Sequence, residues 1–285
     1  MTKVNLKKQI ITLRTLLDLT QEELAKELNV SYETINRWEA ETNEVEPYNV
    51  EKIYTYAFKK KVYFNKISEQ LLKEEESDTT KILFHGAKKD IIFPLDLGHS
   101  KTHNDFGVGF YLGENLSQAA TYVSNASSPR VYAFKLLPLD LNCKTFGVSK
   151  EWMLTIAYYR GWLNNYLNNK YLKQLIREVE SSDVIIAPIA DNRMFDIIQE
   201  FVRGEITDLV CEHSLAATNL GKQYVLRTGK ALGQTTFLDF LYISQIEKET
   251  LVKERLDLNN LSQDKVKLAR IEFRGKGKYI DELLK

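Results

Sequence analysis

The sequence has only two cysteines in 285 residues, Cys143 and Cys211, and they lie far apart and outside any Cys-x-x-Cys pair. This usage argues against a disulfide framework and against a structural zinc site, so we expect both to be packed thiols. The chain also lacks a run of about 18 apolar residues, which excludes a membrane-spanning helix. The first residues do not read as a signal peptide, and the sequence therefore predicts a cytoplasmic protein without a membrane partner.

A net charge is missing as well, because 39 Lys and Arg side chains balance 39 Asp and Glu side chains. The charge of the whole chain therefore gives no argument for binding nucleic acid. Repeats and low-complexity tracts are absent too. What remains is 44% hydrophobic and 11% aromatic content, which is typical of soluble globular proteins. A length of 285 residues predicts two domains.

The first 60 residues carry the pattern of a small helical domain. Apolar residues recur at helical spacing through 6–17, which predicts a first helix. Thr20 and Glu23 form the ends of a capping box that starts a second helix. Ser31 supplies the cap of a third helix, and Pro47 opens a fourth. The spacing therefore predicts an all-α domain over residues 1–66.

A change of composition marks the end of that domain. Residues 67–80 contain an acidic stretch that ends in Ser, Asp and Thr, which is typical of a helix tail running into a linker. Short apolar runs, KILFHG, RVYAFKLLP, DVIIAPIA and KQYVLRT, then alternate with helical segments and predict an α+β domain over residues 81–245. Residues 246–285 are highly charged and favour a helical extension.

The segment LRTLLDLTQEELAKELNVSYETINRWE resembles the helix-turn-helix of the Cro and phage-repressor family. In that fold the third helix enters the major groove of DNA, and the start of the second helix meets phosphates. The resemblance implies that Gln21 is a phosphate-side or supporting contact. It also implies an exposed DNA-recognition face made of Tyr32, Glu33, Thr34, Asn36 and Arg37.

The alternative for this domain is a protein-interaction module. Residues 1–66 carry nearly equal numbers of basic and acidic side chains, whereas DNA binding usually depends on neutralising phosphates. Asn36 and Arg37 suit adenine and guanine edges, but Glu33 accepts only from cytosine. DNA binding is the hypothesis that the pattern favours, and the operator sequence cannot be deduced from it.

A second set of motifs lies in residues 81–240. ILFHGAKKD and DFGVGFYLGENLSQAATYV resemble the ADP-ribosyltransferase fold of diphtheria toxin and the poly(ADP-ribose) polymerases. There a strand ends in His-Gly, and a later Gly-aromatic-Tyr leads into a helix that bears a second Tyr. The wider match, with IIAPIADNRMF and KQYVLRTGKAL, is similar to an uncharacterised bacterial family assigned to that fold. The resemblance implies NAD as the co-substrate and no metal.

The same resemblance assigns roles to individual residues. His85 hydrogen-bonds the adenosine ribose, and the backbone of Gly86 holds the nicotinamide amide. Tyr111 and Tyr122 stack on the two faces of the nicotinamide ring. Lys101 meets the pyrophosphate as a point charge.

One departure from the family pattern concerns the third signature residue, which is normally a Glu near the start of a late strand. Gln223 occupies that position here, and a neutral amide provides neither a general base nor a full countercharge. The polymerases also have a Ser where this chain has Ala119. Polymer extension is therefore not expected. Asp191 is the candidate for the missing carboxylate, and its alternative role is a simple helix N-cap.

Taken together, the motifs predict a multidomain protein in which a helix-turn-helix domain precedes an ADP-ribosyltransferase-like domain. The expected activity is mono-ADP-ribosylation of a protein or nucleic-acid acceptor by a toxin or phage-defence effector, with an antitoxin as a neutralising partner. Two alternatives are a transcription regulator that senses NAD without catalysis and a NAD glycohydrolase. His99, His103 and Asp105 fall in a glycine-containing loop, so we do not expect them to form a metal site.

Overall fold

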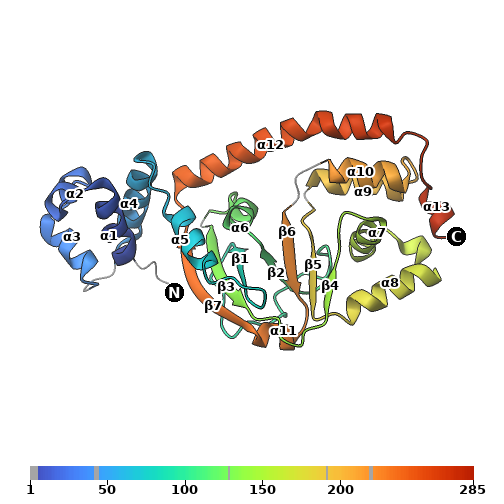
Figure 1. Ribbon diagram of the computed structural model, residues 1–285, viewed down its shortest axis with the longest axis horizontal. Coiled ribbons are helices and arrows are strands. Elements are labelled where there is room, and N and C mark those ends of the chain that lie inside the picture. Colours follow the sequence, from blue (N-terminus) through green and yellow to red (C-terminus); the bar gives the residue numbers. More distant parts are fainter. Residues whose placement is uncertain (1–5, 42–44, 128, 191, 218–220) are drawn as a thin grey trace.

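The computed structural model describes residues 6–41, 45–127, 129–190, 192–217 and 221–285. A helical domain lies at one end of the molecule, and an α+β domain built on one mixed sheet forms the rest (Figure 1). The helical part contains α1 (Leu6–Leu17), α2 (Gln21–Glu27), α3 (Tyr32–Glu39), α4 (Pro47–Lys59) and α5 (Phe64–Lys73). Because α5 extends to Lys73, the stretch predicted as a linker begins as a helix.

The caps predicted from the sequence are confirmed in the helical domain. The Thr20 hydroxyl accepts from the Glu23 amide at 3.1 Å, and the Glu23 carboxylate accepts from the Thr20 amide at 2.8 Å. Ser31 caps α3 in the same way through the amide of Thr34. These bonds satisfy amides that helix starts leave unpaired. The helices then pack around a fully buried core that includes Ile10, Leu13, Leu24, Ile35 and Ile53.

The α+β domain is built on a seven-stranded sheet in the order β4-β5-β6-β2-β1-β3-β7. Among the described residues, β4 and β5 pair in parallel and the other neighbouring strands pair antiparallel. The four predicted strands are β1 (Lys81–Ala87), β3 (Arg130–Leu136), β5 (Val184–Pro188) and β6 (Lys222–Leu226). The sequence interpretation missed β2 (Phe110–Gly113), β4 (Cys143–Thr145) and β7 (Thr235–Tyr242). Cys143 is exposed on the short strand β4, so the expectation that it is packed is wrong.

Helices cover one face of this sheet. On that face lie α6 (Leu116–Val123), α7 (Lys150–Tyr159), α9 (Asn192–Val202) and α10 (Asp208–Ala216), while α8 (Lys170–Glu180) packs beside α7. Trp152 is buried in the large core under these helices and Tyr159 packs against it, so the aromatic residues of α7 are packing elements. Neighbouring residues of β2 face different hydrophobic cores. Tyr111 packs against the core under the helices, and Phe110 is part of a second core. The second core therefore lies on the opposite face.

One long helix near the end of the sequence contacts both domains. Helix α12 (Gln245–Glu272) runs along the top of the molecule in Figure 1, from the helical domain across α6 to α9 and α10. Lys248 of α12 donates to the carbonyl of Ala126 just after α6, and Arg270 pairs with Glu200 of α9 at 2.9 Å.

After α12 the chain turns at glycines with positive φ and forms α13 (Ile280–Leu283). A minor helix, α11 (Gly229–Gly233), and a 3-10 turn (Asn164–Tyr166) complete the fold. In the described part of the chain, no helix is both long and apolar enough to cross a membrane.

The helical domain is fastened to the end of β7 and the start of α12. The Glu51 carboxylate accepts from the Tyr242 hydroxyl at 2.6 Å and from the Gln245 amide at 3.0 Å. The Asn65 side chain donates to the Tyr242 carbonyl at 2.8 Å and to the Glu247 carboxylate at 2.7 Å. Polar contacts thus fix the angle between the two domains.

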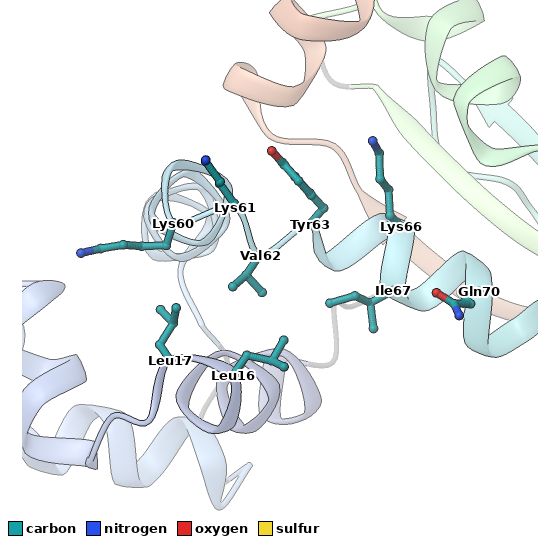
Figure 2. A pocket seen from close by; sticks show the side chains of 9 residues that line it. All are labelled: Leu16, Leu17, Lys60, Lys61, Val62, Tyr63, Lys66, Ile67 and Gln70. Carbon is teal, nitrogen blue, oxygen red and sulfur yellow. The ribbon is translucent and has the colours of Figure 1, made fainter.

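A surface hollow of about 380 Å³ lies where α1 meets the connection from α4 to α5. Figure 2 shows Leu16, Leu17, Val62 and Ile67 pointing toward one another across it, while the nearby lysine ammonium groups point away. The hollow is therefore an apolar seam between α1 and α5, and it lies in the helical domain rather than on the sheet.

Glu247 gives the domain junction a predictable pH dependence. Burial raises the pKa of its carboxyl to about 7, against the opposing effects of Asn65 and Lys66, and the Glu51 charge adds to the rise. A carboxyl whose folded pKa is raised contributes stability that is complete below its unfolded pKa and is lost as pH rises through the folded value. At pH 8 the buried charge therefore costs on the order of 3 kcal/mol.

We predict that Glu247→Gln raises the melting temperature at pH 8 by several degrees and leaves it nearly unchanged at pH 5. The amide keeps an oxygen for Asn65 but carries no charge. Melting curves of wild type and variant at both pH values test this, with Glu249→Gln, an exposed site on the same helix, as the control. Equal melting temperatures of wild type and Glu247→Gln at pH 8 would show that the buried Glu247 charge does not destabilise the fold.

Candidate functional site

The surface predicted to read DNA lies on α3. Tyr32, Glu33, Asn36 and Arg37 are exposed along it, and Thr34 is half-buried beside its cap. The Nε of Arg37 donates to the carbonyl of Glu33 one turn earlier, which holds its stem along the helix. The face therefore presents mixed polar groups to the surroundings, as the sequence predicts.

Gln21 has a structural role in this surface. Its Nε2 donates to the Glu39 carboxylate at 2.7 Å, and Arg14 donates to the other oxygen of that carboxylate at 2.7 Å. These bonds tie α2 and α1 to the end of α3. Of the two roles expected for Gln21, the structure shows the supporting one.

The candidate NAD site lies where the sheet divides. Strands β1 and β3 pair over seven positions and β2 and β6 over four, but β1 and β2 share only the pair Phe84–Gly113. Beyond Phe84 the two strands therefore do not continue their ladder, although His85 and Gly86 follow directly. Backbone polar groups outside a ladder need other partners, and a split of this kind offers them to a ligand.

His85 bridges this split. Its Nδ1 lies 2.7 Å from the carbonyl oxygen of Tyr111 on β2, and its ring stacks on Phe110 with centroids 4.4 Å apart. A carbonyl only accepts, so Nδ1 must carry the proton. Burial lowers the pKa of His85, although the bond to Tyr111 opposes the shift, and the neutral ring leaves Nε2 as an acceptor. A ribose hydroxyl is a donor that such an atom can bind.

Gly86 lies against helix α6. A Cβ at this position would overlap the backbone oxygen of Ala119 and touch Val123. Only glycine therefore lets α6 approach β1 this closely. The same helix carries Tyr122, whose side chain is 73% exposed and thus available to a ligand.

Tyr111 holds the loop that precedes its own strand. Its hydroxyl donates to the Gly107 carbonyl at 2.8 Å and accepts from the Phe106 amide at 3.1 Å. Burial raises the pKa of this hydroxyl above its ordinary value. The stacking of Tyr111 and Tyr122 on the two faces of a nicotinamide ring stays a prediction.

Gln223 lies on β6 directly opposite Gly113 of β2, and paired residues share a face of the sheet. Its Nε2 donates to the Pro188 carbonyl at 3.1 Å and to the Asp105 carboxylate at 3.4 Å. Arg160, the residue directly after α7, donates to the other Asp105 oxygen at 2.6 Å. Sequence reasoning placed Asp105 in a loop and missed this cluster, because its partners are 55 and 118 residues away.

The remaining predicted site residues are only partly located. Lys101 is exposed, and its carbonyl accepts from Asn104. Asp191 lies outside the described residues. His99 lies near Asp96 and is well exposed, so it does not join Asp105. Across the described ranges, no group of three His, Cys, Asp or Glu side chains could hold a metal ion.

Comparison with protein families supports this division of the chain. A helix-turn-helix model matches residues 10–53, from α1 into α4, and supports a DNA-binding regulatory role for the first domain. A second model, described as Protein of unknown function (DUF3990), matches residues 81–237. That match covers more than half of the chain, and the protein belongs to this family. No curated protein and no solved structure matches the chain.

The exposed position of Arg37 on α3 leads to a prediction about DNA binding. We expect Arg37→Ala to weaken binding to DNA from the protein's own promoter region by about 1–3 kcal/mol, as the loss of a base contact does. Fluorescence anisotropy at fixed salt measures the change. Arg203→Ala removes the same charge from an exposed site of the other domain and is the control. If both variants bind as wild type does, Arg37 is not on the recognition face.

Proposed function

We propose that the protein is a NAD-dependent mono-ADP-ribosyltransferase that carries its own DNA-binding module. One observation carries the proposal: the three positions that the family resemblance selects, 85, 111 and 223, lie on the adjacent strands β1, β2 and β6 beside the split in the sheet. In sequence these positions are far apart. Their backbones are neighbours at the split, with the His85 ring against Phe110 on one face and Gln223 on the face of Tyr111, so a ligand seated in the split would meet groups from both faces.

The chemistry of the transfer fits the groups at this site. The bond between the ribose C1′ and the nicotinamide nitrogen breaks, and its electron pair leaves with nicotinamide. A nucleophile of the acceptor attacks C1′ and gives up its proton. The state between these steps resembles an oxocarbenium ion, which a site stabilises with oriented acceptors and charges. His85 Nε2 would bind the adenosine ribose, and the exposed Tyr122 ring would stack on nicotinamide.

Two residues favour transfer of a single ADP-ribose unit. Gln223 can accept a hydrogen bond from a ribose hydroxyl through its amide oxygen. It is too weak a base to activate a sugar hydroxyl for chain extension. Ala119 leaves no hydroxyl on α6 where the polymerases have one. Asp191 remains the carboxylate that the sequence favours for stabilising positive charge, and loss of NAD cleavage in Asp191→Asn, with NAD binding retained, would support that role.

The helix-turn-helix domain limits where the transferase acts. A protein held on DNA meets DNA-bound proteins and the nucleic acid itself at high local concentration. We therefore propose such macromolecules as acceptors. The same arrangement suits a toxin or defence effector that regulates its own gene and is restrained by an antitoxin.

A second candidate is a transcription regulator that senses NAD without cleaving it. It is favoured by one observation, the neutral Gln223 at the position where a general base is expected. A NAD glycohydrolase is a third. Incubation of the full chain with labelled NAD and cell lysate separates the three, because the label appears on macromolecules, stays on intact NAD, or appears as free ADP-ribose.

For the transferase we predict that His85→Ala lowers NAD affinity at least tenfold, because the ribose loses an oriented acceptor. Binding by calorimetry and release of nicotinamide measure the effect. His99→Ala removes an exposed imidazole from the neighbouring loop and should behave as wild type. Wild-type protein that binds NAD but releases no nicotinamide would favour the sensor, and protein that does not bind NAD would exclude both.

A further inference from the structure

Asp105 is a buried carboxylate that the proposed roles do not use. Its exposed fraction is 8%, and it lies at the end of the loop before β2, next to the fully buried Phe106. Both oxygens meet groups that can only donate, the Arg160 guanidinium and the Gln223 amide nitrogen. Burial raises the pKa of Asp105, and the bonds from Arg160 and Gln223 oppose that rise. Because both oxygens face donors, the geometry suits the ionised carboxylate.

These contacts decide which way the Gln223 amide faces. Its nitrogen lies between two acceptors, the Asp105 carboxylate and the Pro188 carbonyl. The opposite orientation would place the amide oxygen against two other oxygens. Oε1 is therefore turned away from Pro188, and no described residue donates a hydrogen bond to it. Gln223 thus offers a fixed acceptor on the face of the sheet that it shares with Tyr111.

The negative charge of Asp105 also polarises the Gln223 amide through this hydrogen bond. An amide that donates to a carboxylate becomes a stronger acceptor at its own oxygen, because hydrogen bonds in series polarise one another. The effect is larger in a buried site than in water. A neutral glutamine bonded to Asp105 therefore presents more negative charge at Oε1 than an isolated glutamine would.

The surroundings hold Asp105 in place. Arg160 is stacked over the Phe195 ring at 4.0 Å from its centroid, so the guanidinium is fixed on both sides. Gly107, two residues after Asp105, has a positive φ and packs against the Tyr159 ring, where a side chain would not fit. The loop cannot shift without breaking these contacts.

From this geometry we propose that Asp105 is a positioning residue that acts through Gln223, and that the two side chains together take the place of the glutamate of the ADP-ribosyltransferases that the sequence resembles. The inference rests on the proposed function. Asp105 orients the amide and supplies the negative charge, while Gln223 Oε1 accepts from the ribose of NAD near the bond that breaks.

The first test replaces the charge alone. Asp105→Asn keeps the shape of the side chain, but its single oxygen can accept from Arg160 or from Gln223 and not from both. We therefore expect a folded protein with a lower melting temperature and a near-normal KM for NAD. Its kcat for nicotinamide release should fall at least tenfold, because Oε1 loses its polarising partner. Melting temperature and NAD affinity are measured alongside kcat.

The second test exchanges the two groups. Gln223→Glu alone puts two carboxylates in contact, and like charges raise the pKa of such a pair. Its activity should therefore fall as pH rises, a limb that wild type lacks. The double variant Asp105→Asn with Gln223→Glu again pairs one carboxylate with one amide, although position 223 then no longer donates to the Pro188 carbonyl. It should recover most of the activity that Asp105→Asn loses and should lack the alkaline limb.

The outcomes separate the inference from the proposed function. Active wild type with Asp105→Asn within twofold of its kcat would overturn the role of Asp105 and leave the transferase intact. Failure of the double variant to exceed Asp105→Asn, or an unshifted pH profile in Gln223→Glu, would overturn it as well. Wild-type protein that releases no nicotinamide from NAD would overturn both.

Discussion

The short pairing between β1 and β2, called the joint below, is the constraint on which the rest of the α+β domain depends. A single ladder pair, Phe84–Gly113, connects the two halves of the sheet, and each half is otherwise paired within itself. One side-chain bond, from His85 to the Tyr111 carbonyl, spans the gap that follows. That bond fixes the tautomer of His85 and the separation of the strands together. A site built there is defined by backbone positions, which are harder to displace than loop side chains.

The groups on either side of the joint are held by separate means. On the β1 side, glycine at position 86 allows α6 to pack directly on the strand, and this sets the position of Tyr122. On the β2 side, the Tyr111 hydroxyl and Asp105 fasten the preceding loop to β2 and β6. The loop is thus an integral part of the core rather than a free surface segment. Its polar groups are aligned before any ligand arrives, which is the condition for electrostatic stabilisation of a charged transition state.

How far the sequence could predict this structure depends on how local each signal is. The caps at Thr20 and Ser31 act within three residues, and the starts of α2 and α3 follow from them. The strand β2 has four residues and includes a glycine, too few for alternation to be recognised. The pairing of Asp105 with Gln223 spans 118 residues and leaves no trace in spacing. Local chemistry therefore predicted most helices and four of the strands, the family resemblance supplied the candidate site residues, and the contacts between them required the fold.

The attachment of the DNA-binding domain follows from the same sheet. Glu51 and Asn65 both bind Tyr242, the last residue of β7, and β7 pairs with β3, which pairs with β1. The helical domain is therefore anchored two strands away from the strand that carries His85. Helix α12 adds a second anchor, because it leaves this junction and reaches α9 through Arg270. Two anchors at different places fix an orientation, whereas a flexible linker would fix only a distance. The recognition helix and the split in the sheet consequently keep one geometry relative to each other.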